Sequence, residues 1–217
     1  MYNVAKDCEV KNLAEIYNKY FDDNYKGIFV EIGAYDGKTG SNVSALAENG
    51  WTGYCFEPEP NNFQQLVLFY KNNENILCFS IAIGKEGIGK LFINHSYSTT
   101  SDEQYELYKK HHWMGGDEPC IAINKISFNK ILEDLQIKTI DVLSVDTEGT
   151  ELEVLQTFDI NKYQPKIAII EAHQNHPLEG FGRYAEEINL YFLNAGYEII
   201  YSDAVNNVYV QKNIFVK

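Results

Sequence analysis

The sequence is poor in cysteine and has no cysteine pattern typical of a metal or redox site. Its four cysteines, Cys8, Cys55, Cys78 and Cys120, are widely spaced, and no two of them form a C-x-x-C pair. A zinc-binding or C-x-x-C redox function is therefore not indicated. Cys55 and Cys78 fall within apolar stretches, so we expect them to be small buried side chains. All four thiols are expected to be free.

A long apolar segment and an excess of positive charge are also missing. No stretch resembles a signal peptide or has the apolar length of a membrane-spanning helix, so we expect a cytoplasmic protein without a membrane span. The chain has 31 acidic and 18 basic residues, which gives a formal net charge of -13. Because nucleic acids and anionic membranes favour a basic surface, neither is expected as the main partner.

The length and the apolar spacing indicate one α/β domain. A chain of 217 residues can bury one substantial core, so we expect a single domain over residues 1–217. Residues 9–21 have helical apolar spacing and are expected to form an N-terminal amphipathic helix. From residue 28 onward, short apolar strands, among them one expected over residues 76–83, alternate with helical segments. This alternation is typical of a mostly parallel sheet with helices on both faces.

The stretch Phe29–Gly37 is the centre of this pattern. A buried strand over residues 28–32 leads into a turn with Gly33 and Gly37, and a helix follows with Ser41 as its N-cap. Ligands of such sheets bind at the carboxyl ends of the strands, where glycine lets the backbone approach them closely. The stretch therefore predicts a ligand-binding site.

The spacing of the glycines separates the kinds of ligand that this turn could bind. A dinucleotide site has the pattern G-x-G-x-x-G, and the gap between Gly33 and Gly37 is too wide for it. A P-loop has the pattern G-x-x-x-x-G-K-[ST], and the stretch from Gly33 is one residue short of it. A P-loop kinase or NTPase that uses Lys38, Thr39 and Asp146 is nevertheless kept as an alternative.

Carboxylates on the turn favour a cationic ligand over a triphosphate. Glu31 and Asp36 would repel phosphate groups but would suit an amino group. S-adenosylmethionine has an ammonium, a sulfonium and no phosphate, so it fits this turn. A further acid, Glu57, ends the next strand about twenty residues later, where it can bind two ribose hydroxyls.

Several motifs occur together between residues 28 and 171: the strand and turn Val30–Gly37, then Ser41-Asn42, Gly50–Gly53, Glu57-Pro58 and Asp141–Leu152. In combination they resemble the FkbM family of S-adenosylmethionine-dependent methyltransferases. The resemblance implies a class I methyltransferase, Rossmann-like fold that ends in an antiparallel strand pair. It also implies O-methylation, typically of a sugar or a sugar-containing product.

The resemblance and the local chemistry together give a set of cofactor-binding residues. The residues expected to bind S-adenosylmethionine are Glu31, Gly33, Asp36 and Gly37 at its methionine part, Ser41 and Asn42 in the adjacent helix, and Glu57 at its ribose.

The acceptor, a small molecule or a glycan, is expected beyond the later strands. Residues 95–120 form a long polar stretch that we expect to be a wall or lid of the acceptor site. The candidate catalytic residues are Asp146, Glu148 and His173. Asp146 and Glu171, at the ends of neighbouring strands, could hold Mg²⁺ or orient His173 as a general base. A non-catalytic adenosyl-binding module is a further alternative.

Overall fold

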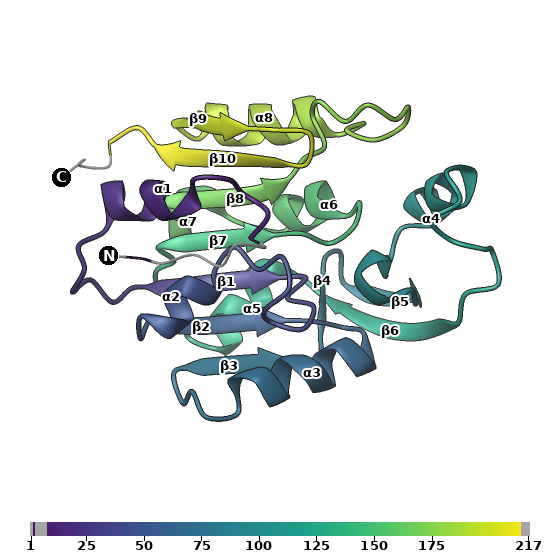
Figure 1. Cartoon of the computed structure of the whole chain (residues 1–217), viewed down its shortest axis with the longest axis horizontal. Coiled ribbons are helices and arrows are strands. Elements are labelled where there is room, and N and C mark those ends of the chain that lie inside the picture. Colours follow the sequence, from purple (N-terminus) through teal and green to yellow (C-terminus); the bar gives the residue numbers. More distant parts are fainter. Residues whose placement is uncertain (1, 3–7, 214–217) are drawn as a thin grey trace.

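A seven-stranded sheet forms the centre of the molecule (Figure 1). The structure, a computed structural model, describes Tyr2 and residues 8–213. The domain predicted over residues 1–217 also includes residues 1, 3–7 and 214–217, which lie outside the described residues. In spatial order the strands are β3 (Ile76–Phe79), β2 (Thr52–Phe56), β1 (Ile28–Ile32), β7 (Val142–Val145), β8 (Ile167–Glu171), β10 (Asn206–Gln211) and β9 (Tyr197–Ser202).

The directions of the strands match the sequence-based prediction. All neighbouring strands from β3 to β8 run parallel, whereas β10 runs antiparallel to both β8 and β9. The predicted α/β fold, with a mostly parallel sheet and a terminal antiparallel pair, is confirmed.

Helices cover both faces of this sheet, as predicted. One face packs against α1 (Leu13–Tyr20), α2 (Ser44–Glu48) and α3 (Pro60–Tyr70). The other face packs against α5 (Phe128–Asp134), α6 (Glu151–Gln156), α7 (Ile160–Tyr163) and α8 (Ala185–Asn194). Since both faces are covered, a strand such as β8 is buried along its whole length and is apolar without alternation as far as Ile170.

The N-terminal helix is shorter than the predicted range of 9–21. It begins at Leu13, because Asn12 takes a left-handed conformation with φ of 63°. Glu9 therefore precedes the helix, and its backbone N–H donates to the Gly40 carbonyl at 3.4 Å. This contact brings the N-terminal segment to the glycine turn after β1.

The apolar stretch 76–83, which the sequence indicates as one strand, is divided between two sheets. β3 ends at Phe79, and β4 (Ala82–Ile83) joins a second sheet of order β4-β6-β5 with β6 (Cys120–Ile126) and β5 (Gly87–Phe92). β4 pairs in parallel with Lys125 and Ile126 of β6. The prediction was wrong here because apolar character does not identify the strand with which a segment pairs.

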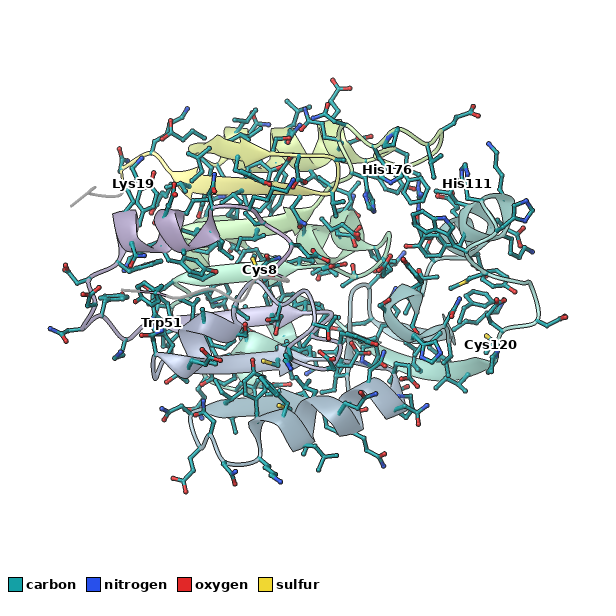
Figure 2. All side chains as sticks on the ribbon, viewed as in Figure 1. Cys8, Lys19, Trp51, His111, Cys120 and His176 are labelled. Atoms are coloured by element: carbon teal, nitrogen blue, oxygen red, sulfur yellow. The ribbon has the colours of Figure 1, made fainter. Side chains whose placement is uncertain are left out.

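Residues 95–120 contain more regular structure than the sequence suggests. A short 3₁₀ turn, η1 (His95–Tyr97), is followed by α4 (Asp102–Lys110), whose first turn is capped by the Ser101 hydroxyl. In Figure 1, α4 lies beyond the carboxyl ends of the central strands. In Figure 2, His111 and His176 lie at this end of the molecule, whereas Trp51 lies at the opposite end.

No disulfide joins the cysteines of the described residues, and Cys55 is buried as expected. Within residues 8–213, none of the helices combines the length and the apolar character that crossing a bilayer requires.

Candidate active site

The order of the strands creates a crevice at the carboxyl ends of β1 and β7. The chain runs outward from β1 to β2 and β3 on one side, and from β7 to β8 on the other. Ligands of open α/β sheets bind at such a point of reversal. A cavity lies here, lined by the ends of β1, β2 and β7, by the glycine turn and by residues of β4 and of segment 95–100.

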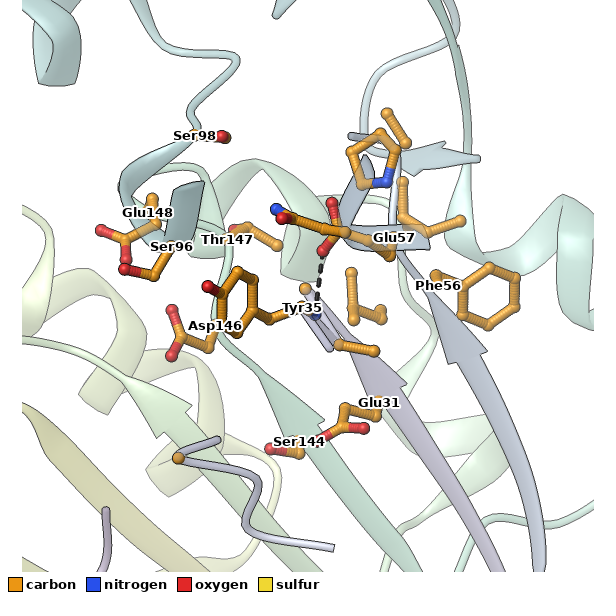
Figure 3. A pocket seen from close by; sticks show the side chains of 18 of the residues that line it. Glu31, Tyr35, Phe56, Glu57, Ser96, Ser98, Ser144, Asp146, Thr147 and Glu148 are labelled. Atoms are coloured by element: carbon orange, nitrogen blue, oxygen red, sulfur yellow. Dashed lines mark hydrogen bonds between the residues drawn. The ribbon is translucent and has the colours of Figure 1, made fainter. Parts of the chain in front are cut away.

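The cavity is rich in carboxylates. Its lining includes Glu9, Glu31, Glu57, Asp146 and Glu148, and of the described residues no lysine or arginine lines it. In Figure 3, Asp146 and Glu148 lie on one side of the cavity and Glu57 lies on the other. Such a lining favours a ligand with positive charge or with many hydrogen-bond donors.

Glu31 is a buried carboxylate with one oxygen in use. It lies within β1 and is 4% exposed. Its Oε1 accepts a hydrogen bond of 2.8 Å from the Ser41 hydroxyl, whereas no nitrogen or oxygen of the described residues donates to Oε2. Burial raises the pKa of Glu31 to about 8, although the Ser41 hydrogen bond opposes that shift. A cation beside Oε2 would therefore stabilise the ionised form.

Glu57, directly after β2, is held by two backbone donors. Its Oε2 accepts from the Tyr35 N–H at 2.9 Å, and its Oε1 accepts from the Glu59 N–H at 2.8 Å. Burial raises the pKa of Glu57 to about 7, and both backbone hydrogen bonds lower it. The carboxylate is thus fixed in orientation at the edge of the cavity.

The glycine turn is shaped by close backbone contacts. The N–H groups of Gly33 and Ala34 both donate to the Phe56 carbonyl, at 2.9 and 3.0 Å. Gly33 has φ of +83°, and a Cβ there would lie 1.5 Å from the Asp146 carbonyl oxygen. Only glycine fits this position, because the turn after β1 passes against the end of β7.

Two residues predicted to bind the cofactor do not line the cavity. The Asp36 carboxylate turns back onto its own loop, where it accepts from the N–H groups of Lys38 and Thr39 and from the Thr39 hydroxyl. Gly37 packs against the side chains of α3 instead. The structure does bring Glu31, Gly33, Ser41, Asn42 and Glu57 together around one cavity.

The acceptor-side candidates meet in a cluster of carboxylates. Asp146 follows β7, Glu148 lies in the loop before α6, and Glu171 ends β8; their ligand oxygens all lie within 4.8 Å of one another. Burial raises the pKa of Glu148 to about 8 and the pKa values of Asp146 and Glu171 well above their usual range. The neighbouring carboxylates add to the shift in each case.

His173 lies behind this cluster and does not line the cavity. Its Nε2 is 3.0 Å from Glu171 Oε1, although without hydrogen-bond geometry, and neither ring nitrogen has a hydrogen-bond partner within the described part of the chain. Its ring contacts those of His176 and Phe181, with centroid distances of 5.1 Å in both cases.

Three residues of this site or at its border were not predicted from the sequence. Tyr108 of α4 donates its hydroxyl to Glu148 Oε2, and the Thr99 hydroxyl donates to the Glu148 carbonyl at 2.7 Å. Glu9 reaches the cavity from the segment before α1. None of the three belongs to a motif. For Tyr108 and Thr99, the only signal in the sequence was the length of the polar stretch 95–120.

The fold and the cavity define the class of protein. A sheet of five parallel strands ended by an antiparallel pair, with an acid-lined cavity at the point of reversal, is that of a class I S-adenosylmethionine-dependent methyltransferase. The family model described as "Methyltransferase FkbM domain" matches residues 31–199, which is more than half of the chain. The chain therefore belongs to the FkbM methyltransferase family.

Solved structures agree on the fold. Methyltransferase FkbM from Methylobacillus flagellatus KT is similar, with a TM-score of 0.51 and 16% identity over 88% of this chain and 44% of that chain. This chain thus spans less than half the length of that protein. Precorrin-6y C5,15-methyltransferase from Geobacter metallireducens GS-15 has a TM-score of 0.51 and 11% identity over 98% of this chain and 93% of its own. No curated protein sequence matches this chain.

Family membership overturns the P-loop alternative. Lys38, which would bind phosphate in that interpretation, is exposed and does not line the cavity. Without a lysine or arginine among the described lining residues, the cavity would repel a triphosphate. The chain is a member of a methyltransferase family, and S-adenosylmethionine is the cofactor of that class.

Proposed function

We propose that this enzyme transfers a methyl group to a hydroxyl oxygen of a sugar, a glycan or a related metabolite. The observation that carries the proposal is the lining of the cavity. Five carboxylates line it, and the segment between β5 and α4 adds the hydroxyls of Ser96, Ser98 and Thr100. Carboxylates and hydroxyls suit a neutral ligand with many hydroxyl groups, whereas an anionic acceptor would be repelled.

The residues on the β1 and β2 side of the cavity fit the methyl donor. Glu31 has an unused, buried oxygen that an ammonium group would pair with. The oriented Glu57 carboxylate can accept hydrogen bonds from two ribose hydroxyls, and the apolar residues Ile81, Ala82 and Ile83 offer a surface for the adenine ring. Because Gly33 has no side chain, the backbone of the turn can lie close to the bound ligand.

S-adenosylmethionine supplies a methyl group on a positively charged sulfur, so the carbon–sulfur bond breaks as an acceptor oxygen bonds to the methyl carbon. The protein's contribution is then to hold that oxygen in line, an effect that can lower the barrier by roughly 7 to 11 kcal/mol. The acceptor hydroxyl also has to lose its proton, and a general base contributes about 10² to 10⁴ in rate.

His173 is our candidate base, with Glu171 beside it. The Glu171 carboxylate is 3.0 Å from His173 Nε2 and would stabilise the imidazolium that forms. Because His173 does not line the cavity, its ring has to rotate, or a water molecule has to relay the proton. Asp146 and Glu148 would then bind the acceptor from the β7 side.

Two measurements test this proposal. First, S-adenosylhomocysteine at about a hundredfold its dissociation constant should stabilise the full chain by roughly 2.7 kcal/mol, which raises the melting temperature by about 5 to 10 °C. ATP with Mg²⁺ should give no shift. Second, methyl transfer from labelled S-adenosylmethionine to a panel of neutral sugars and glycans should give a methyl ether, located by mass spectrometry.

The outcomes separate the alternatives. Binding of S-adenosylhomocysteine with no product from any hydroxylated acceptor would favour a non-catalytic adenosyl-binding module. A product methylated on nitrogen or carbon would keep the methyltransferase and reject the O-methylation.

A further inference from the structure

We infer that Asp146, Glu148 and Glu171 form a binding site for a divalent cation of the hard, oxygen-preferring class, such as Mg²⁺ or Ca²⁺. The inference deepens the proposed function and rests on it, because it assigns the cation to the acceptor side of the same cavity.

The first support is the convergence of three oxygen ligands. β7 and β8 are neighbouring parallel strands, so residues at their carboxyl ends meet at one edge of the sheet. The ligand oxygens of Asp146, Glu148 and Glu171 lie within 4.8 Å of one another. Opposite ligands of a cation with bonds of about 2.1 to 2.5 Å lie roughly 4.2 to 5 Å apart, so all three oxygens can reach one ion.

The second support is that two buried oxygens in this cluster have no hydrogen-bond donor among the described residues. Glu171 is 5% exposed, and neither its Oε2 nor the buried Asp146 Oδ1 is given a donor by any described group. The two carboxylates face each other, so they need a shared proton or a cation between them. Both oxygens of Glu57, by contrast, accept backbone N–H groups. A buried carboxylate oxygen without a donor is costly, and a bound cation removes that cost.

The third support is the balance of charge around the cavity. Glu31 and Glu57 are assigned to the methyl donor, which leaves the three clustered acids without a counter-charge. Arg183, a basic side chain beside α4, is directed to Gln104 and Glu103 of that helix. His173 beside Glu171 can neutralise one carboxylate at most. The negative charge that then remains on the cluster is matched better by the two positive charges of one divalent ion than by any side chain described there.

The hydrogen bonding of the Glu148 carboxylate leaves one of its two oxygens available to a cation. The Tyr108 hydroxyl donates to Glu148 Oε2 and fixes the carboxylate, while Oε1 stays available. A cation held by these groups would bind an acceptor oxygen directly and would lower the pKa of that hydroxyl. This would allow a neutral sugar hydroxyl to react near neutral pH.

The test measures cation binding directly. Mn²⁺, which prefers the same oxygen ligands and is paramagnetic, is titrated into the full chain saturated with S-adenosylhomocysteine, and bound Mn²⁺ is followed by electron paramagnetic resonance. Competition by Mg²⁺ and Ca²⁺ is then measured. The variants are Glu171→Gln, Asp146→Asn and Glu148→Gln. The matched control is Glu187→Gln, an exposed acid on α8.

We expect one Mn²⁺ per chain in the wild type and in Glu187→Gln, and binding weakened by about tenfold or more in each cluster variant, because affinity depends on the number of ligand charges. Equal binding in all variants would place the ion elsewhere, and no binding to the wild type would mean that the acids share protons instead. Either result overturns the inference.

The same samples, treated with EDTA, separate this inference from the proposed function. A thermal shift with S-adenosylhomocysteine that persists in EDTA, together with no Mn²⁺ binding, rejects the cation site alone. Absence of that shift in the wild type rejects the proposed cofactor site. If one cluster variant does not fold, the other two and the wild type still decide the question.

Discussion

At the scale of single residues, Glu57 and Glu31 differ in the hydrogen bonds that hold their carboxylates. Glu57 accepts two backbone hydrogen bonds, so its orientation is fixed before any ligand arrives. Glu31 accepts the Ser41 hydroxyl at Oε1, and no described nitrogen or oxygen donates to its Oε2, which is left for a ligand. The first arrangement suits hydroxyl groups that need directed acceptors, and the second suits a cationic group.

The first prediction concerns this unused oxygen. Glu31→Gln removes the charge that would pair with the amino group of the cofactor but keeps the shape and the Ser41 contact. Since hydrogen bonds to charged groups contribute about 1.5 to 3 kcal/mol, affinity for S-adenosylhomocysteine should fall roughly tenfold to a hundredfold. Isothermal titration calorimetry measures the change.

The control is Glu48→Gln, an exposed acid at the end of α2. It should leave the affinity unchanged. An equal loss in both variants would mean that the negative field of the whole molecule attracts the cofactor, and that Glu31 makes no special contact.

At the scale of elements, the turn after β1 depends on the end of β7. Gly33 lies so close to the Asp146 carbonyl that a Cβ would fall 1.5 Å from it. Gly33→Ala should therefore push the turn away from β7, lower the free energy of unfolding by several kcal/mol and abolish cofactor binding. Urea denaturation gives the first quantity and the thermal shift with S-adenosylhomocysteine gives the second.

Gly196→Ala is the matched control for backbone strain. Gly196 also has a positive φ, of +86°, but a Cβ at this position would meet no atom within 4 Å. The variant should lose only about 1 to 2 kcal/mol, the cost of the left-handed conformation. Equal losses at both positions would show that strain, and not the contact with Asp146, decides the identity of Gly33.

Our proposal assigns helix α4 to the acceptor side, because Tyr108 contacts Glu148. Tyr108→Phe leaves the half-buried Glu148 carboxylate without this donor, a change that costs about 1 to 3 kcal/mol. We expect kcat/KM for the acceptor to fall about tenfold, while affinity for S-adenosylhomocysteine is unchanged. Tyr105→Phe, on the same helix but bonded to the partly exposed Glu118, should change neither. A parallel loss of cofactor affinity in Tyr108→Phe would contradict the assignment of α4 to the acceptor.

The elements also show what could be predicted from the sequence. β1, β2 and the acids near their ends were predictable, because apolar strand patterns and glycine turns depend on neighbouring residues. The exit of the chain at Ser80 into a second sheet was not, because strand pairing depends on distant residues. For the same reason, the arrival of Glu9 and Tyr108 at the site could not be predicted, and neither could the turn of Asp36 back onto its own loop.

At the scale of the whole molecule, buried acids link stability to pH. The pKa of Glu31 is raised from 4.5 to about 8, and that of Glu57 to about 7. A raised pKa means that, at any pH between the pKa of the group in the unfolded chain and its pKa in the folded chain, the folded chain binds more protons. The stability that this binding contributes is complete below pH 4.5 and is lost as pH rises toward 8.

The last prediction follows from this sign. Without ligand, the wild type should lose unfolding free energy relative to Glu31→Gln as the pH rises from about 5 to about 8. The reason is that Glu31 ionises over this range, whereas glutamine does not titrate. Since the cofactor's ammonium favours the ionised Glu31, the thermal shift caused by S-adenosylhomocysteine should grow more over the same range in the wild type than in the variant, where Glu57 still titrates. Urea denaturation and thermal melts at steps of about one pH unit across this range measure both quantities. A ligand-induced shift in the wild type that shrinks as pH rises would mean that the cofactor binds protonated Glu31, and the proposed pairing with the ammonium would then be wrong.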